Sequence, residues 1–126
     1  MKILDRFRGY LLKIFGKIDP VLIADLKELR ILLAEPKAFA KKSLARDTYG
    51  YRIDPLHREA VSFCLMGGGV RVTGSMRNPR YFEIMKSLRK AVPWLYAPIL
   101  LPDFSDQSSH AEILTLIDRA LIRAGA

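Results

Sequence analysis

Apolar residues recur every three or four positions along most of the chain. The first run of this kind consists of Leu22, Leu26, Leu29 and Leu33. Three later runs have the same spacing: Ala60, Phe63, Cys64 and Gly67; Phe82, Met85, Leu88 and Val92; and Ile113, Leu116, Ile117, Ala120 and Leu121. This spacing places the apolar side chains of each run on one face of a helix. The pattern predicts four helices that share one core.

A fifth helix is indicated at the N-terminus. Within residues 1–18, aromatic and aliphatic side chains recur at helical spacing, and the basic side chains lie mostly on the opposite side. This segment predicts a basic amphipathic helix. Residues 19–126 contain no internal repeat and no linker, so we expect them to form a single helical domain.

Several helix starts carry a capping signal. Asp19-Pro20, Asp54-Pro55 and Asn78-Pro79 each place a capping side chain before a proline, and proline is tolerated in the first turn because its missing N–H is not needed there. Ser109 and Glu112 have the spacing of a capping box. These signals predict the start of four helices.

Strand signals are weak. Residues 70–73 alternate between polar and apolar, and residues 95–101 are apolar but interrupted by a proline. We therefore expect a mainly α, single compact domain of about five helices, with room for one short β-hairpin.

The composition fits one small domain in a reducing compartment. Half of the 126 residues are hydrophobic, which suffices for one core. Cys64 is the only cysteine and has no partner for an intramolecular disulfide, so we expect a cytoplasmic protein. No stretch approaches the roughly 20 apolar residues that span a bilayer, and we expect neither a transmembrane segment nor a signal peptide.

The formal net charge of +8 is unevenly distributed. Residues 2–90 contain 19 of the 21 lysines and arginines but only 9 of the 13 acidic residues. A basic surface favours nucleic acid, an anionic membrane or an acidic protein as a partner. We expect that surface to come from the first three-quarters of the chain.

Ten basic residues are candidate contacts for such a partner. They surround a polar turn and then follow a run of glycines: Lys41, Lys42, Arg46 and Arg52, then Arg71, Arg77, Arg80, Lys86, Arg89 and Lys90. If they share one face, they would contact phosphates, and Tyr49, Tyr51 or Tyr81 would stack on bases. The alternative is a solvated surface that keeps the protein soluble. Our leading hypothesis is a small non-enzymatic binding protein whose basic face contacts nucleic acid or an acidic protein.

A second pattern joins the polar turn to the last helix. It consists of Ala45-Arg46-Asp47-x-x-Gly50, then Ala60-x-x-x-Cys64-x-x-Gly67, then Phe104-Ser105-Asp106 followed by Glu112-Ile113. This order resembles a family of small uncharacterised bacterial and phage proteins, a domain of unknown function, over about residues 22–124. That family usually has asparagine at the position of Ser105 and Ala-Leu at Gly68-Gly69. The resemblance implies a compact, mainly helical fold, no established activity, and an association with phages or mobile elements.

The shared positions also have structural explanations. Asp47 and Gly50 are typical of a tight turn, in which aspartate accepts backbone N–H groups and glycine supplies a positive φ. Asp106 would stabilise the loop before the last helix or its N-terminal end, and Glu112 belongs to the capping box. The functional alternative is that Asp47 and Asp106 form a carboxylate pair, which would raise one pKa and permit acid-base chemistry.

The glycine run 67–69 invites interpretation as a phosphate-binding loop. We expect Gly67 to follow a helix rather than a strand, and no Lys-Ser/Thr pair accompanies it, so a helix end or close helix packing is favoured. Cys64 lies on a core-facing stripe and is expected to be a buried apolar residue. On a single helix, His57 and Cys64 would be too far apart to share a metal ion. We expect no metal and no cofactor.

Two further hypotheses accompany the leading one. The first is a protein adaptor or inhibitor, a homo-oligomer or a peripheral membrane protein, acting through the N-terminal amphipathic helix and the apolar segment around Trp94. That segment, residues 93–101, either covers the core or forms an interface. The second is a small enzyme that uses a carboxylate or Cys64.

Overall fold

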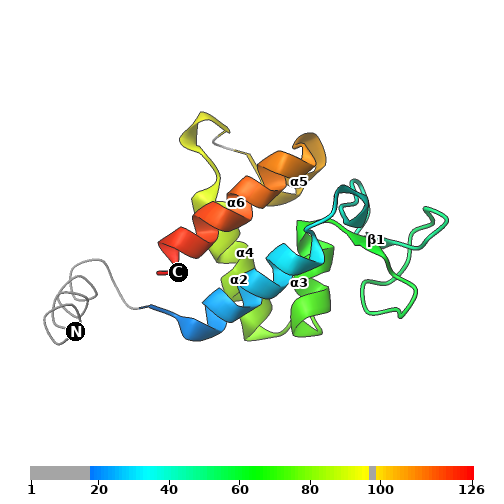
Figure 1. The fold of residues 1–126 in the computed structure, drawn as a ribbon, viewed down its shortest axis with the longest axis horizontal. Coiled ribbons are helices and arrows are strands. Elements are labelled where there is room, and N and C mark those ends of the chain that lie inside the picture. The colour runs from blue at the N-terminus through cyan, green and yellow to red at the C-terminus, as the bar shows by residue number, and fades with distance from the viewer. Residues whose placement is uncertain (1–17, 97–98) are drawn as a thin grey trace, which may run out of the picture.

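The computed structural model describes residues 18–96 and 99–126 (Figure 1). Its helices are α2 (Pro20–Leu32), α3 (Leu65–Thr73), α4 (Pro79–Ala91), α5 (Leu101–Gln107) and α6 (His110–Arg123), with short 3-10 helices η1 (Pro36–Ala38) and η2 (Trp94–Tyr96). Strands β1 (Ala45–Arg46) and β2 (Ser62–Phe63) pair antiparallel. The described part is mainly helical with one small hairpin-like sheet, which confirms the predicted fold class. Nearly all of the predicted N-terminal helix lies outside the described residues.

Helices α2, α3, α4 and α6 pack against one another and enclose the core. Figure 1 shows α2 and α6 side by side, with β1 and its loops projecting beyond the end of α2. The fully buried side chains include Leu26, Leu29, Leu65, Ile84, Leu88, Leu116 and Ile117. The apolar runs on α2 and α6 therefore face the core, as their spacing predicts. On α4 the predicted run is wrong in part, because Phe82 is 58% exposed and the buried residues of this helix are Ile84, Leu88 and Ala91.

Three of the predicted helix starts are confirmed by their capping hydrogen bonds. The Asp19 carboxylate accepts from the backbone of α2, and Asn78 Oδ1 accepts from the backbone of α4. At the start of α6, Ser109 Oγ accepts from Glu112 N at 3.2 Å, and Glu112 Oε1 accepts from Ser109 N at 3.0 Å. The hydrogen bond that Ser109 N donates to the carboxylate is the main reason that the pKa of Glu112 lies below its ordinary value.

The predicted helix start at Asp54-Pro55 is wrong. Asp54 Oδ1 accepts from Leu56 N at 2.8 Å, and tight turns follow at His57 and Ala60 instead of a helix. The Arg71 guanidinium donates to the carbonyl oxygens of Pro55 and His57 and so holds this loop. An aspartate that accepts from the backbone two residues on forms a turn as readily as a helix cap.

The apolar run that follows this loop, predicted to be one helix, contains strand β2 and then the first turn of α3. Residues 62–65 are all buried in succession, as happens where a strand is covered on both sides. Helix α3 begins only at Leu65, with Cys64 as its N-cap, and ends at Thr73, with Gly74 at a φ of +92° as its C-cap. Residues 70–73, with their weak strand signal, are helical.

The glycine run lies in the first half of α3 and follows strand β2, so its prediction as a helix end is wrong. The alternative of close helix packing is confirmed. A Cβ on Gly68 would lie 2.6 Å from Leu29 Cδ1, and one on Gly69 would lie 2.6 Å from Met85 Cε. The glycines therefore allow α3 to approach both α2 and α4.

Backbone donors in the first turn of α3 are engaged inside the protein. Leu65 N donates to Ser105 Oγ at 3.4 Å, and Gly67 N donates to Cys64 Sγ at 3.3 Å. The backbone carbonyl of Leu44 covers Gly67. Although the glycines follow a strand, these contacts disfavour a phosphate-binding loop here.

Helix α5 has no counterpart among the predicted elements. We expected Ser105 and Asp106 in a loop before the last helix, but both lie inside α5. Ser105 is fully buried, and Asp106 Oδ1 accepts from Lys42 N at 2.8 Å. Two neighbouring side chains of α5 thus bind the backbones of two distant segments.

One ion pair joins a buried carboxylate to an exposed arginine, so the loss of either partner is expected to have a different cost. The Asp25 carboxylate is 4% exposed and accepts from Arg80 Nε at 2.9 Å and from Arg80 Nη2 at 2.6 Å. These hydrogen bonds raise the pKa of the Arg80 guanidinium above its ordinary value. Arg80→Met would leave a buried carboxylate without its partner, whereas Asp25→Asn would leave an exposed arginine to water.

We expect Arg80→Met to lose more stability in urea denaturation than Asp25→Asn. The double variant should be more stable than Arg80→Met alone, because a neutral amide is cheaper to bury unpaired than a carboxylate. Arg89→Met, an exposed change on the same helix, serves as the control. Equal losses in the two single variants would contradict this role of the pair.

Candidate nucleic-acid interface

Three of the ten predicted basic contacts have internal partners. The guanidinium groups of Arg46 and Arg71 donate to backbone carbonyl oxygens of nearby turns, and Arg80 binds Asp25. The other seven form two groups on different elements: Lys41, Lys42 and Arg52 beside β1, and Arg77, Lys86, Arg89 and Lys90 on or just before α4. The predicted basic face is thus reduced to two smaller sets of cations.

The segment after β1 forms a turn fixed by hydrogen bonds. Asp47 Oδ1 accepts from Tyr49 N and from Tyr51 N, each at 2.9 Å, and Asp47 N donates to Tyr51 O at 2.9 Å. Gly50 has a φ of +84°, which favours glycine. The structural interpretation of Asp47 and Gly50 is therefore confirmed.

This turn presents two aromatic rings to solvent. Tyr49 is 85% exposed and Tyr51 is 71% exposed. Arg46 stabilises the turn, because its guanidinium donates to Gly50 O at 3.0 Å and to Lys41 O at 3.1 Å. The backbone that carries both rings is held in place without a ligand, so binding would not have to order it.

Three exposed cations lie on the segments that flank this turn, and Glu59 lies beside Tyr49. Lys41, Lys42 and Arg52 are exposed, and Arg52 forms an isolated bridge opposite Arg46. Lys42 has a φ of +61° and donates its backbone N–H to Asp106. Within residues 18–96 and 99–126, no salt bridge involves any of the three. We call Tyr49, Tyr51, Lys41, Lys42 and Arg52 together the tyrosine turn.

Tyr81 does not belong to this surface. It is half-buried on α4, where its ring lies 3.1 Å from the Cβ position of Gly69, and burial raises its pKa. Its ring is part of the packing between α3 and α4. Of the three tyrosines predicted to stack, the structure exposes Tyr49 and Tyr51.

Cys64 lacks the setting of a nucleophile. It is 3% exposed, its sulfur accepts from Gly67 N, and burial raises the pKa of its thiol. A reactive cysteine needs an exposed, electropositive setting that lowers the pKa. The expectation of a buried, structural cysteine is confirmed.

The two carboxylates of the enzyme hypothesis, and both histidines, form separate contacts. Asp47 holds the tyrosine turn, and Asp106 holds Lys42 N. His110 Nε2 lies 2.7 Å from Leu33 O, and His57 Nδ1 accepts from the backbone two residues on. In the part of the chain that the structure describes, no group of three or more His, Cys, Asp or Glu residues suits a metal ion.

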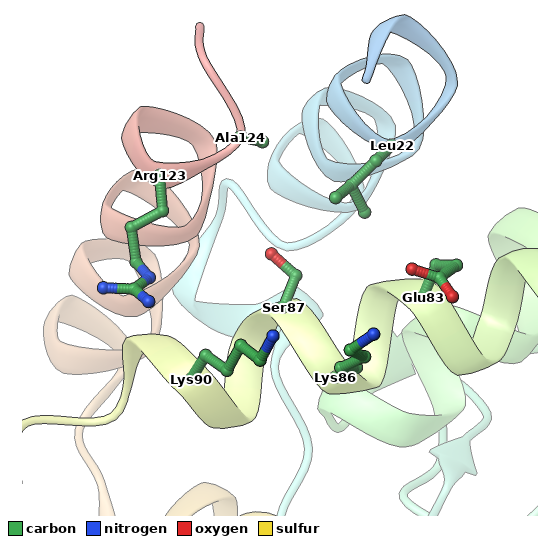
Figure 2. Close-up of a pocket in the computed structure, with 7 residues that line it drawn as sticks. All are labelled: Leu22, Glu83, Lys86, Ser87, Lys90, Arg123 and Ala124. Atoms are coloured by element: carbon green, nitrogen blue, oxygen red, sulfur yellow. The ribbon is translucent and has the colours of Figure 1, made fainter. Parts of the chain in front are cut away.

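A second basic feature is a hollow between α2, α4 and α6, of about 410 Å³. Its lining comprises Leu22, Glu83, Lys86, Ser87, Lys90, Arg123 and Ala124. Figure 2 shows Lys86, Ser87 and Lys90 on α4 and the Arg123 side chain extending from α6 towards α4. We call this feature the α4–α6 hollow. Sequence reasoning missed Arg123 because it lies in the acidic last quarter of the chain, and Ser87 because it carries no motif.

The apolar segment around Trp94 is largely exposed. Trp94 and Leu95 belong to η2 and are 82% and 73% exposed, while the Tyr96 ring packs edge-on against Phe104. Ile99 is half-buried against the core. The segment covers the core only in part, and the interface hypothesis for it stays a prediction.

Comparisons with models of known families, with curated proteins and with solved structures found no match. The resemblance to the uncharacterised bacterial and phage family stays a prediction. No helix among the described residues has the length and apolar character needed to cross a membrane.

Proposed function

We propose that this protein binds single-stranded nucleic acid through the tyrosine turn. The observation that carries the proposal is a turn, fixed by Asp47 and Arg46, that exposes two aromatic rings. Three exposed cations, Lys41, Lys42 and Arg52, lie on the segments that flank it. Every base has a face on which a tyrosine ring can stack, and an exposed strand offers phosphates between its bases. Cytoplasmic location and a non-catalytic role belong to the same proposal.

The expected energetics have two separate parts. Stacking contributes about 1 to 3 kcal/mol per base, so two rings give a binding term that depends little on salt. Lys41, Lys42 and Arg52 supply a second term that weakens with salt, since each neutralised phosphate releases a counterion. Three such contacts predict a slope of about −2 for the logarithm of affinity against the logarithm of salt concentration.

We expect a fluorescently labelled oligothymidylate to bind the full chain, as measured by anisotropy at several salt concentrations. Tyr49→Ala with Tyr51→Ala should weaken binding by at least about 30-fold at constant salt slope. Neutralising Lys41, Lys42 and Arg52 to glutamine should instead reduce the slope towards zero. A lower affinity at constant slope therefore reports the loss of stacking, and a smaller slope reports the loss of phosphate contacts.

The matched control is Tyr49→Phe with Tyr51→Phe, which keeps both aromatic faces and should retain most of the affinity. Absence of binding at low salt would overturn the proposal. So would a tyrosine-to-alanine variant that binds as the parent does. Equal binding of polyglutamate, unaffected by loss of the rings, would indicate an acidic protein partner instead.

A further inference from the structure

A second binding site is indicated by four polar side chains from two helices that line the α4–α6 hollow. Lys86, Ser87 and Lys90 come from α4, and Arg123 comes from the last turn of α6 (Figure 2). The hollow has a volume of about 410 Å³, which lies in the range of small-molecule sites. We infer that it binds the phosphate group of a phosphate monoester.

The charges in the hollow match a dianion. Lys86, Lys90 and Arg123 contribute three positive charges, and Glu83 at the edge contributes one negative charge. Within residues 18–96 and 99–126, no salt bridge or side-chain hydrogen bond involves the three cations, Ser87 or Glu83. A phosphate monoester carries close to two negative charges at neutral pH and would satisfy this excess.

The donor set also matches the shape of a phosphate. The Arg123 guanidinium can bind two oxygens as a planar fork, while lysine ammonium groups bind as point charges. The Ser87 hydroxyl adds a neutral donor from between the two lysines. These donors come from two packed helices rather than from a loop, which limits their movement.

The remaining lining residues indicate an organic ester rather than the bare ion. Leu22 and Ala124 form an apolar wall beside the donors, and the Glu83 carboxylate can accept from a hydroxyl group of the ligand. The source of the ester is either a small phosphorylated polyol or the 5′-phosphate of a nucleic acid. The recognised chemistry is the same in both.

The hollow is separate from the tyrosine turn. Leu22 lies in the first turn of α2, whereas the other end of α2 leads through η1 towards β1. A helix of 13 residues is about 18 Å long between its end residues. The failure of one site in an experiment therefore does not imply the failure of the other.

The test is isothermal titration calorimetry of the full chain with inorganic phosphate, ribose 5-phosphate and ribose. We expect both phosphates to bind in competition and ribose not to bind. Lys90→Met with Arg123→Met should weaken phosphate binding by at least about 100-fold, since each lost charge-assisted contact costs about tenfold or more. Both residues are exposed, so the fold should persist.

Arg89→Met is the matched control, because Arg89 is an exposed cation of α4 that does not line the hollow. It should bind phosphate as the parent does. An equal loss in this control, or equal affinity for chloride, would show a general charge effect and overturn the site. Absence of binding by either phosphate would also overturn it.

Oligonucleotides with and without a 5′-phosphate distinguish the two sources. A preference for the phosphorylated strand over ribose 5-phosphate, lost in the Lys90→Met and Arg123→Met variant, would support a nucleic-acid end. Equal or tighter binding of ribose 5-phosphate, lost in the same variant, would support a small ligand. Both outcomes support the site.

Discussion

Replacement of Gly67 by alanine is expected to destabilise the protein by at least about 3 kcal/mol. The new Cβ would lie 1.6 Å from Leu44 O and 2.5 Å from Leu44 C. These are backbone atoms, so no rotamer change relieves the overlap. The Leu44 carbonyl would have to move away, and it accepts from Cys64 N at 3.3 Å. The substitution therefore also threatens the junction between β2 and α3.

Gly69→Ala is the matched control on the same helix. Its Cβ would meet the flexible end of the Met85 side chain at 2.6 Å and the Tyr81 ring at 3.1 Å, so only side chains, and no backbone atoms, have to give way. Alanine also favours a helix over glycine by about 1 kcal/mol, so the net change should be small. Urea denaturation of both variants measures the difference. Similar stability of the two would contradict the close approach of Leu44 to Gly67.

Local capping chemistry explains why much of the fold follows from the sequence. At Asp19-Pro20 and Asn78-Pro79 the capping signal is followed by an amphipathic run, and both start helices. At Asp54-Pro55 the same dipeptide starts a turn, since the exposed residues 56–59 have no apolar face to pack. A cap signal predicts a helix only when tertiary packing stabilises the turns that follow it.

The candidate surfaces depend on contacts between distant segments, which spacing along the chain cannot supply. The motif at Asp47 and Gly50 predicts a turn, and the structure adds that Tyr49 and Tyr51 point into solvent on it. The proximity of Arg123 to Lys90 depends on the packing of α4 against α6. Local motifs therefore predicted individual turns and side chains of the candidate sites, and the packing of the helices determined which of these residues lie close together.

Asp106→Ala is expected to destabilise the protein by about 2 kcal/mol, although this residue looked like a candidate catalytic acid. Its carboxylate accepts from Lys42 N at 2.8 Å and holds Lys42 at a φ of +61°. A lysine in this conformation is strained by about 1 kcal/mol, and the hydrogen bond offsets that cost. Loss of the carboxylate leaves both the strain and an unpaired N–H. Urea denaturation measures the change.

Two further variants separate this role from acid-base chemistry. Asp106→Asn keeps an oxygen acceptor without the charge and should retain most of the stability. Lys42→Gly in the Asp106→Ala background should recover about 1 kcal/mol, because glycine adopts a positive φ without strain. An Asp106→Asn variant as unstable as Asp106→Ala would show that the charge matters rather than the backbone hydrogen bond. The expected result would mean that Asp106 on α5 holds the backbone of Lys42, and so positions Lys41 and Lys42 of the tyrosine turn.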